Sequence, residues 1–159
     1  MAVQVAIFTV GDRYLSGGTK DEAGENLNAS CLKMGWEVVA RQALGDDEQA
    51  LVGQLLQTAD SGTVDILFTV DGIGARPTDR VPEAMYQVCE KWLPGLPELI
   101  RNKAYEKTPL VGLTRGAAGI RGKTVLINMP GSPTAVKDAM EVLRPILRLA
   151  VDQVKGASA

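Results

Sequence analysis

The stretch "VQVAIFTV" (residues 3–10) gives the first indication of the fold class of this chain. It is rich in β-branched residues and almost uninterrupted in its apolar character, which is typical of a β-strand buried on both faces. Three further segments, residues 36–44, 64–70 and 124–129, read as strands of the same kind. Strands buried on both faces belong to parallel sheets that helices cover on either side. The four segments therefore predict an α/β fold with a mostly parallel sheet.

Segments with helical patterns alternate with these strands. They lie in residues 25–35, 45–60, 82–93, 94–107 and 133–155. Pro145 lies inside the last segment, and we expect it to kink or divide that helix, because proline removes a backbone donor. Residues 108–123 are expected to form short extended pieces and turns. A length of 159 residues fits one domain, so we expect residues 1–159 to fold as a single unit.

Composition excludes several classes of site. The net charge of −2 provides no basic field for nucleic acid, and no histidine is present for a zinc site or a Ser–His triad. Cys31 and Cys89 are far apart and lie within helical patterns, so we expect reduced, mostly buried thiols in a cytoplasmic protein. We expect no signal peptide and no membrane helix, because no basic leader or long apolar run is present.

Four polar loops follow the predicted strands: residues 11–24, 45–48, 71–81 and 130–133. Ligands of parallel sheets bind beyond the carboxyl ends of the strands, where loops that are distant in sequence meet. We therefore expect these four loops to form one site. Without histidine, the chemistry falls to carboxylates, lysines, arginines and backbone groups. A magnesium–nucleotide site is compatible with this restriction, because Mg²⁺ takes oxygen ligands.

The loop "DGIGARPTDRV" (residues 71–81) has two interpretations. Gly72 and Gly74 would let backbone N–H groups approach a phosphate, and Asp79 would hold magnesium. Alternatively, the glycines only make a tight turn and Asp79 caps the helix that Pro82 enters. The spacing alone favours the turn, because D-G-x-G matches neither the Rossmann fingerprint nor a Walker loop.

The other loops also leave alternatives open. Asp46 and Asp47 would be N-cap and first-turn acids of a helix. Alternatively, Asp46 would bind a metal together with Asp79. Ser132 in "MPGSP" would cap the last helix, bind an anion, or do both. Asp12 belongs to "GDR", a possible anion contact. Arg115 lies near Arg121 and Lys123, and the three would suit an anionic ligand or form a solvated turn.

Taken together, these loops resemble the Mog/MoaB family of molybdenum cofactor biosynthesis, which includes the G domain of gephyrin. Eight family motifs occur in order over nearly the whole chain. Their counterparts here are "TVGDR" (9–13), "DEAG" (21–24) with Leu27, "LGDD" (44–47), residues 69–84, "PG" (94–95) with Glu98 and Arg101, "TP" (108–109) with "LTR" (113–115), "AGIRG" (118–122) and "MPGSP" (129–133).

The resemblance implies a three-layer α/β fold and an assembly that is a homotrimer or a hexamer. It implies transfer of AMP from Mg-ATP to molybdopterin, with a molybdate-insertion enzyme as a possible partner. Asp46 and Asp79 match the two aspartates that the family associates with catalysis and magnesium. The motifs also imply ligand-binding positions, namely Asp12, Gly72, Gly74, Arg115, Gly119, Gly131 and Ser132.

The chain departs from the family pattern at five positions of the presumed nucleotide end: Gly11, Ala23, Asp71, Ile73 and Thr78. An acid at position 71 would repel a triphosphate unless magnesium, Arg76 or Arg80 compensates for its charge. Three interpretations follow: an adenylyltransferase with an altered loop, a paralogue that binds molybdopterin without adenylylating it, or a scaffold of the pathway.

Overall fold

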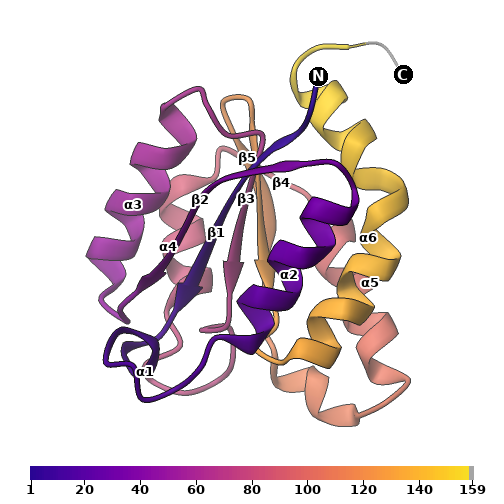
Figure 1. Ribbon diagram of the computed structural model, residues 1–159. Coiled ribbons are helices and arrows are strands. Elements are labelled where there is room, and N and C mark those ends of the chain that lie inside the picture. The colour runs from indigo at the N-terminus through magenta and orange to yellow at the C-terminus, as the bar shows by residue number, and fades with distance from the viewer. Residues whose placement is uncertain (158–159) are drawn as a thin grey trace.

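A six-stranded sheet forms the centre of the computed structural model, which describes residues 1–157 (Figure 1). Its strands are β1 (Gln4–Val10), β2 (Glu37–Leu44), β3 (Ile66–Val70), β4 (Lys91–Trp92), β5 (Ala118–Arg121) and β6 (Thr124–Met129). They lie in the order β2-β1-β3-β6-β5-β4. The first four in this order are parallel, whereas β5 and β4 add an antiparallel edge. The prediction of a mostly parallel sheet is confirmed.

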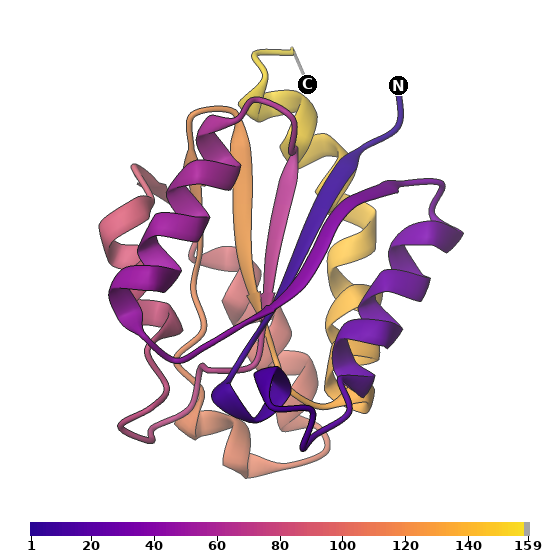
Figure 2. The same ribbon diagram turned by 60° about the vertical axis from the view of Figure 1, so that its left-hand side comes forward.

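Helices cover both faces of the sheet, which gives three layers (Figures 1 and 2). The longer helices are α2 (Glu22–Lys33), α3 (Glu48–Asp60), α4 (Val81–Val88), α5 (Gly95–Tyr105) and α6 (Pro133–Val154). The shorter ones are α1 (Asp12–Leu15) and the 3₁₀ helix η1 (Pro109–Leu113). The core on one face joins the sheet to α2, α5 and α6, and the core on the other joins it to α3 and α4.

Strand β1 shows why the apolar run predicts this architecture. Successive side chains of a strand point to opposite faces. Val5 and Ile7 therefore enter the core beneath α2 and α6, while Ala6 and Phe8 enter the core beneath α3 and α4. All four are at most 1% exposed. Burial of each large side chain contributes about 1.5–3 kcal/mol, so both cores stabilise this central strand.

One predicted loop and one predicted helix have different limits in the structure. The segment 11–24 is not entirely a loop, because it contains α1 and the first turn of α2, where Asp21 accepts a hydrogen bond from the Gly24 amide at 2.8 Å. The helix predicted for residues 82–93 ends at Val88. The Leu93 amide instead donates to the Ala118 carbonyl at 2.9 Å. Pairing with β5 thus replaces the last predicted turn.

One of the two effects expected of Pro145, division of the terminal helix α6, is not found. The helix runs without a break through Pro145, so the proline does not divide it. Leu143 and Leu147 are fully buried on either side of that position. Their packing on the core holds both halves of the helix against the sheet, because an amphipathic helix is stabilised mainly by its apolar face. None of the helices within residues 1–157 combines the length and the apolar character that crossing a bilayer requires.

Candidate functional site

The carboxyl ends of β1, β2, β3 and β6 lie at the same end of the sheet, because these strands are parallel. The four predicted loops follow these ends. The Gly11 amide donates to the Leu44 carbonyl at 2.8 Å, which joins the first loop to the second. The Asp71 amide donates to the Met129 carbonyl at 3.0 Å, which joins the third to the fourth. The structure therefore brings together loops that are distant in the sequence.

Three of these loops enclose a small cavity of about 130 Å³. Its lining is strongly charged and contains four carboxylates and two guanidinium groups. The lining residues are Val10, Gly11, Asp12, Arg13, Asp46, Asp71, Gly72, Arg76, Thr78 and Asp79. Four predicted site residues are thus brought together here: Asp12, Asp46, Gly72 and Asp79.

Of these residues, Asp46 has the side chain that is most available to a ligand. Its amide is held by the Asp12 carboxylate, which accepts from it at 3.0 Å. No side chain within residues 1–157 forms a hydrogen bond or an ion pair with the Asp46 carboxylate, and the Asp46 side chain is half-buried. Burial raises the pKa of this carboxyl, and the neighbouring charges of Asp12, Asp79 and Asp71 add to the effect. A partly desolvated carboxylate among other carboxylates is poised for a cation.

This donor set fits Mg²⁺ in its chemistry, because Mg²⁺ prefers carboxylate oxygens. The described residues nevertheless provide no group of three side chains arranged as a complete set of metal ligands. Proteins commonly hold Mg²⁺ with one or two carboxylates, while water and substrate phosphates supply the other ligands. Asp46 and Asp79 match that arrangement, with Asp46 as the less engaged of the two.

Asp79 is buried, and it does not cap α4. Its Oδ2 accepts a hydrogen bond from the Arg76 amide at 3.0 Å and lies 3.5 Å from the Arg76 Nε. A Cβ atom on Gly74 would lie 2.7 Å from the same oxygen, so the second glycine of the loop makes room for this carboxylate. The expected helix cap is therefore wrong, and the loop folds around Asp79 instead. The cap at α3 belongs to Asp47, which accepts from the Ala50 amide at 3.0 Å.

Arg115 holds the loop 71–81 from outside. Its side chain forms a two-bonded ion pair with Glu83, at 2.6 and 3.1 Å, and lowers the pKa of that carboxyl. It also donates to the carbonyls of Gly74 and Asp79, at 2.8 and 2.7 Å. The backbone amide of Arg115 donates to the Ile73 carbonyl at 2.7 Å. These bonds assign Arg115 a positioning role for the loop, because its donors point at protein acceptors.

The predicted group of Arg115, Arg121 and Lys123 does not converge. Arg121 pairs with Asp60, at the carboxyl end of α3, with Nε 2.9 Å from Oδ1. Helix α3 begins near the carboxyl ends of the parallel strands, where the cavity lies, and ends near their amino ends. Arg121 therefore lies far from the cavity. An antiparallel strand, β5, connects the two positions and carries Arg121 away from Arg115.

Asp71 is compensated by a different arginine from those expected. Its Oδ2 is paired with the Arg13 guanidinium and accepts from the Tyr14 hydroxyl at 2.7 Å. Arg76 is engaged with Asp79, and Arg80 with Glu48. The pairing of Asp71 joins residues 58 positions apart in the chain, which no local pattern reveals. Tyr14 in particular was missed by sequence reasoning, because a single tyrosine in a polar segment has no periodic signal.

The remaining predicted site residues lie at three different places. Gly131 packs directly on Asp71, since a Cβ there would lie 2.5 Å from the Asp71 Cγ. Ser132 caps α6 by accepting from the Ala135 amide at 3.2 Å, as the capping interpretation predicts. Gly119 pairs with Trp92 and Leu126 within the sheet and faces Cys89, away from the cavity.

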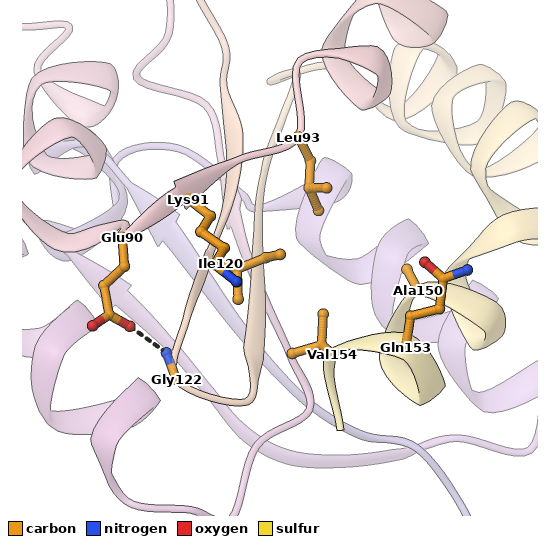
Figure 3. A pocket seen from close by; sticks show the side chains of 8 residues that line it. All are labelled: Glu90, Lys91, Leu93, Ile120, Gly122, Ala150, Gln153 and Val154. Atoms are coloured by element: carbon orange, nitrogen blue, oxygen red, sulfur yellow. Dashed lines mark hydrogen bonds between the residues drawn. The ribbon is translucent and has the colours of Figure 1, made fainter. Parts of the chain in front are cut away.

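Two other hollows differ in character from the charged cavity. One, of about 490 Å³, lies between the β4–β5 edge and the end of α6 (Figure 3). Its one carboxylate, Glu90, accepts from the Gly122 amide at 2.7 Å, so no set of catalytic groups converges there. The other, of about 240 Å³, has mostly apolar walls, and Ile73 and Pro130 line it. This apolar hollow shares the loop 71–81 with the charged cavity.

Comparisons with known proteins agree in family and fold. Residues 6–149 match a family described as a probable molybdopterin binding domain. A molybdopterin adenylyltransferase of Helicobacter pylori is 29% identical, over 97% of this chain and 89% of the relative. The molybdopterin adenylyltransferase of Escherichia coli K12 is 29% identical over 87% and 72% of the two chains.

Solved structures extend this likeness to the whole fold. The molybdopterin biosynthesis enzyme MoaB of Thermus thermophilus superimposes with a TM-score of 0.90 at 34% identity, over 97% of each chain. The Mog protein of Mycobacterium ulcerans gives a TM-score of 0.88 at 33% identity, over 96% of this chain and 99% of that one.

Proposed function

Because the chain belongs to the Mog/MoaB family of molybdenum cofactor biosynthesis, we propose that it is a molybdopterin adenylyltransferase. An oxygen of the terminal phosphate of molybdopterin attacks the α-phosphorus of ATP. The bond from that phosphorus to the bridging oxygen breaks, and pyrophosphate leaves with the electron pair. The products are adenylylated molybdopterin and pyrophosphate. The nucleophile is already a phosphate oxygen, so the site does not have to remove a proton from it.

The observation that carries the proposal is the meeting of Asp46 and Asp79 in one cavity. They come from loops after β2 and β3, yet they lie close enough that the charge of Asp79 helps to raise the pKa of Asp46. Two hard carboxylates beside a glycine-containing loop suit a metal-bound polyphosphate. The resemblance in motif order points to the same two residues independently of this geometry.

Positioning is the main contribution that the chain's own residues make. Asp46 and Asp79 hold the magnesium complex of the nucleotide, and Arg76 keeps Asp79 oriented through its amide. Arg115 keeps the loop 71–81 in shape. Magnesium, when bound, supplies charge neutralisation for the phosphates. Holding both substrates in line is the larger part of catalysis in phosphoryl-group chemistry, and it requires no general base.

Molybdopterin lies beside the nucleotide in this proposal. The apolar hollow next to the charged cavity suits a flat ring, because its walls include Ile73, Ile100 and Val111, with Arg101 at its edge. The proposal further includes a homotrimer and a partner enzyme that inserts molybdate. The unpaired thiols of Cys31 and Cys89 agree with a reducing, cytoplasmic setting.

The direct test measures adenylylated molybdopterin formed by the purified protein with Mg-ATP. We expect Asp46→Asn to lower the rate by about 100-fold or more, because it removes charge that holds the metal complex. Asp47→Asn is the matched control, since it removes a neighbouring charge while asparagine preserves the cap of α3. Equal rates for wild type and Asp46→Asn would contradict the proposed role of Asp46.

A second candidate function rests on the geometry of Asp71. Its carboxylate lies among donors that a phosphate would use, which favours a paralogue that binds molybdopterin without adenylylating it. Calorimetric titration separates the two functions. Absence of heat at millimolar Mg-ATP, with molybdopterin binding retained, would establish the second function. In that case the double change Asp71→Gly and Ile73→Thr should restore transfer.

A further inference from the structure

Asp71 has an unusual backbone and an unusually complete set of partners. Among residues 1–157 it is the only non-glycine residue with a positive φ, at 72°. Its side chain is 15% exposed. The carboxylate is paired with the Arg13 guanidinium and accepts from the Tyr14 hydroxyl at 2.7 Å and from the Gly72 amide at 2.9 Å. A strained conformation is retained where surrounding contacts stabilise it.

The three donors around this carboxylate form an anion-binding arrangement, which we call the anion seat. A guanidinium, a hydroxyl and a backbone N–H after a strand are the groups with which proteins hold phosphate oxygens. In this chain they are supplied by Arg13, Tyr14 and Gly72, and they are all directed at Asp71. The chain therefore fills the seat with its own carboxylate. Burial and this carboxylate also raise the pKa of the Tyr14 hydroxyl, which keeps it a donor.

The charges of the cavity reinforce this arrangement. Four carboxylates and two guanidinium groups line it, so the lining is net negative. Both guanidinium groups are engaged, Arg13 with Asp71 and Arg76 with Asp79. A polyphosphate without a metal would thus meet an excess of negative charge and find the seat occupied. The repulsion between a carboxylate and a phosphate at contact is substantial in such a partly buried place.

We propose that Asp71 is a specificity-determining residue that occupies the anion seat of Arg13, Tyr14 and Gly72 and excludes metal-free polyphosphate from the site. The inference rests on the proposed function only in treating the charged cavity as a place for phosphate. Removal of the Asp71 side chain frees the three donors and lowers the negative charge of the cavity. Neither change depends on whether the protein transfers AMP.

The test is calorimetric titration with inorganic pyrophosphate in the presence of a chelator that removes divalent cations. We expect Asp71→Gly to bind pyrophosphate at least about 10-fold more tightly than wild type. Glycine suits the positive φ of this position, so the variant should fold. Asp71→Asn is the more conservative variant, because asparagine also tolerates this conformation, and we expect a smaller gain in affinity.

Two matched variants separate the seat from a general charge effect. Asp47→Asn removes one negative charge near the cavity without freeing Arg13, and its affinity should equal that of wild type. The double variant Arg13→Ala, Asp71→Gly should lose the gain, because the seat then lacks its cation. Far-ultraviolet circular dichroism of each variant verifies its fold.

The proposal is overturned if wild type binds pyrophosphate as tightly as Asp71→Gly. It is equally overturned if neither Asp71 variant gains affinity, or if the double variant keeps the gain. A gain in Asp71→Gly that disappears with Arg13→Ala supports it even when no adenylylated molybdopterin is formed. Failure of the enzyme function and failure of this inference therefore give different results.

Discussion

Asp71 and Gly131 form a tightly fitted pair of residues at the site edge. The first follows β3 and the second follows β6, two strands that are neighbours in the sheet. A Cβ on Gly131 would lie 2.5 Å from the Asp71 Cγ, which is closer than van der Waals contact allows. The absence of a side chain at 131 is therefore tied to the acid at 71.

We expect Gly131→Ala to destabilise the fold by about 1–3 kcal/mol, because the new methyl group must displace the Asp71 carboxylate from its partners. In a protein that already carries Asp71→Gly, Gly131→Ala should destabilise the fold much less. Urea unfolding of the four proteins of this double-mutant cycle measures the coupling. Gly53→Ala is the control. Position 53 lies in α3 with no atom within 4 Å of an added Cβ, so this change should stabilise by about 0.5–1 kcal/mol. Additive effects at 71 and 131 would contradict the contact.

Asp46 illustrates a cost that a functional residue imposes on stability. Its pKa is raised by burial and by neighbouring carboxylates, so its charged form is less favourable in the folded than in the unfolded protein. The contribution of such a group is most favourable below its unfolded-state pKa and is lost as the pH rises through its folded-state pKa. At neutral pH the ionised side chain therefore destabilises the fold.

Asp46→Asn should raise the free energy of unfolding at pH 7, since the amide carries no charge. This advantage should decline as the pH falls through the raised pKa of Asp46 and disappear below its ordinary value, where the carboxyl is protonated in both states. Urea unfolding of both proteins from pH 7 to acidic pH is the measurement. A difference that stays constant with pH would show that the charge of Asp46 is not its cause.

At the scale of elements, α6 tolerates a proline that an isolated helix would not. Pro145 is exposed, and it lacks the amide that would donate to the carbonyl one turn earlier. The helix continues because its buried face packs against the sheet and the neighbouring helices on both sides of the proline. Packing outweighs a local cost of roughly 3 kcal/mol.

Pro145→Ala is expected to increase the free energy of unfolding by about 1–3 kcal/mol, because it restores the missing backbone hydrogen bond and removes steric conflict within the helix. Thermal or urea unfolding measures this gain. Arg144→Ala serves as the comparison, since it alters the adjacent exposed position without a backbone effect and should change stability by no more than about 0.5 kcal/mol. A destabilised Pro145→Ala variant would contradict this account of the helix.

At the scale of the whole molecule, several large apolar side chains lie on the surface. Large apolar side chains are exposed on α4, β4 and η1, namely Tyr86, Trp92, Leu110 and Leu113. The rings of Tyr86 and Trp92 lie 5.2 Å apart between centroids, at the edge of the sheet. Surfaces of this kind are typical of contacts between protein chains.

We expect the protein to sediment at micromolar concentration as one species of three times the chain mass of 16.9 kDa. The family resemblance provides the number of copies, and the exposed apolar side chains provide a driving force. Sedimentation velocity over a dilution series measures the mass and its concentration dependence. A species of single-chain mass throughout that series would contradict the trimer.

The sequence alone predicted the four parallel strands of the sheet and the end of the sheet at which the site lies, but not the antiparallel pair β4 and β5. Apolar runs such as residues 3–10, alternating with helical segments, favour a parallel sheet that helices cover on both faces. The carboxyl ends of parallel strands then meet, so Asp46 and Asp79 were predictable as neighbours. The cap by Ser132 was predictable because it acts within its own turn, whereas the cap expected of Asp79 was wrong.

Which groups pair with one another at that end of the sheet depends on the tertiary structure. The contact of Arg13 and Tyr14 with Asp71 and the end of α4 at Val88 depend on segments far apart in the chain. So does the continuity of α6 through Pro145. Local propensity does not contain these contacts, because their energy comes from partners that the fold alone brings within reach. The acid at 71 thus appears in the sequence as an anomaly and in the structure as the occupant of an anion seat.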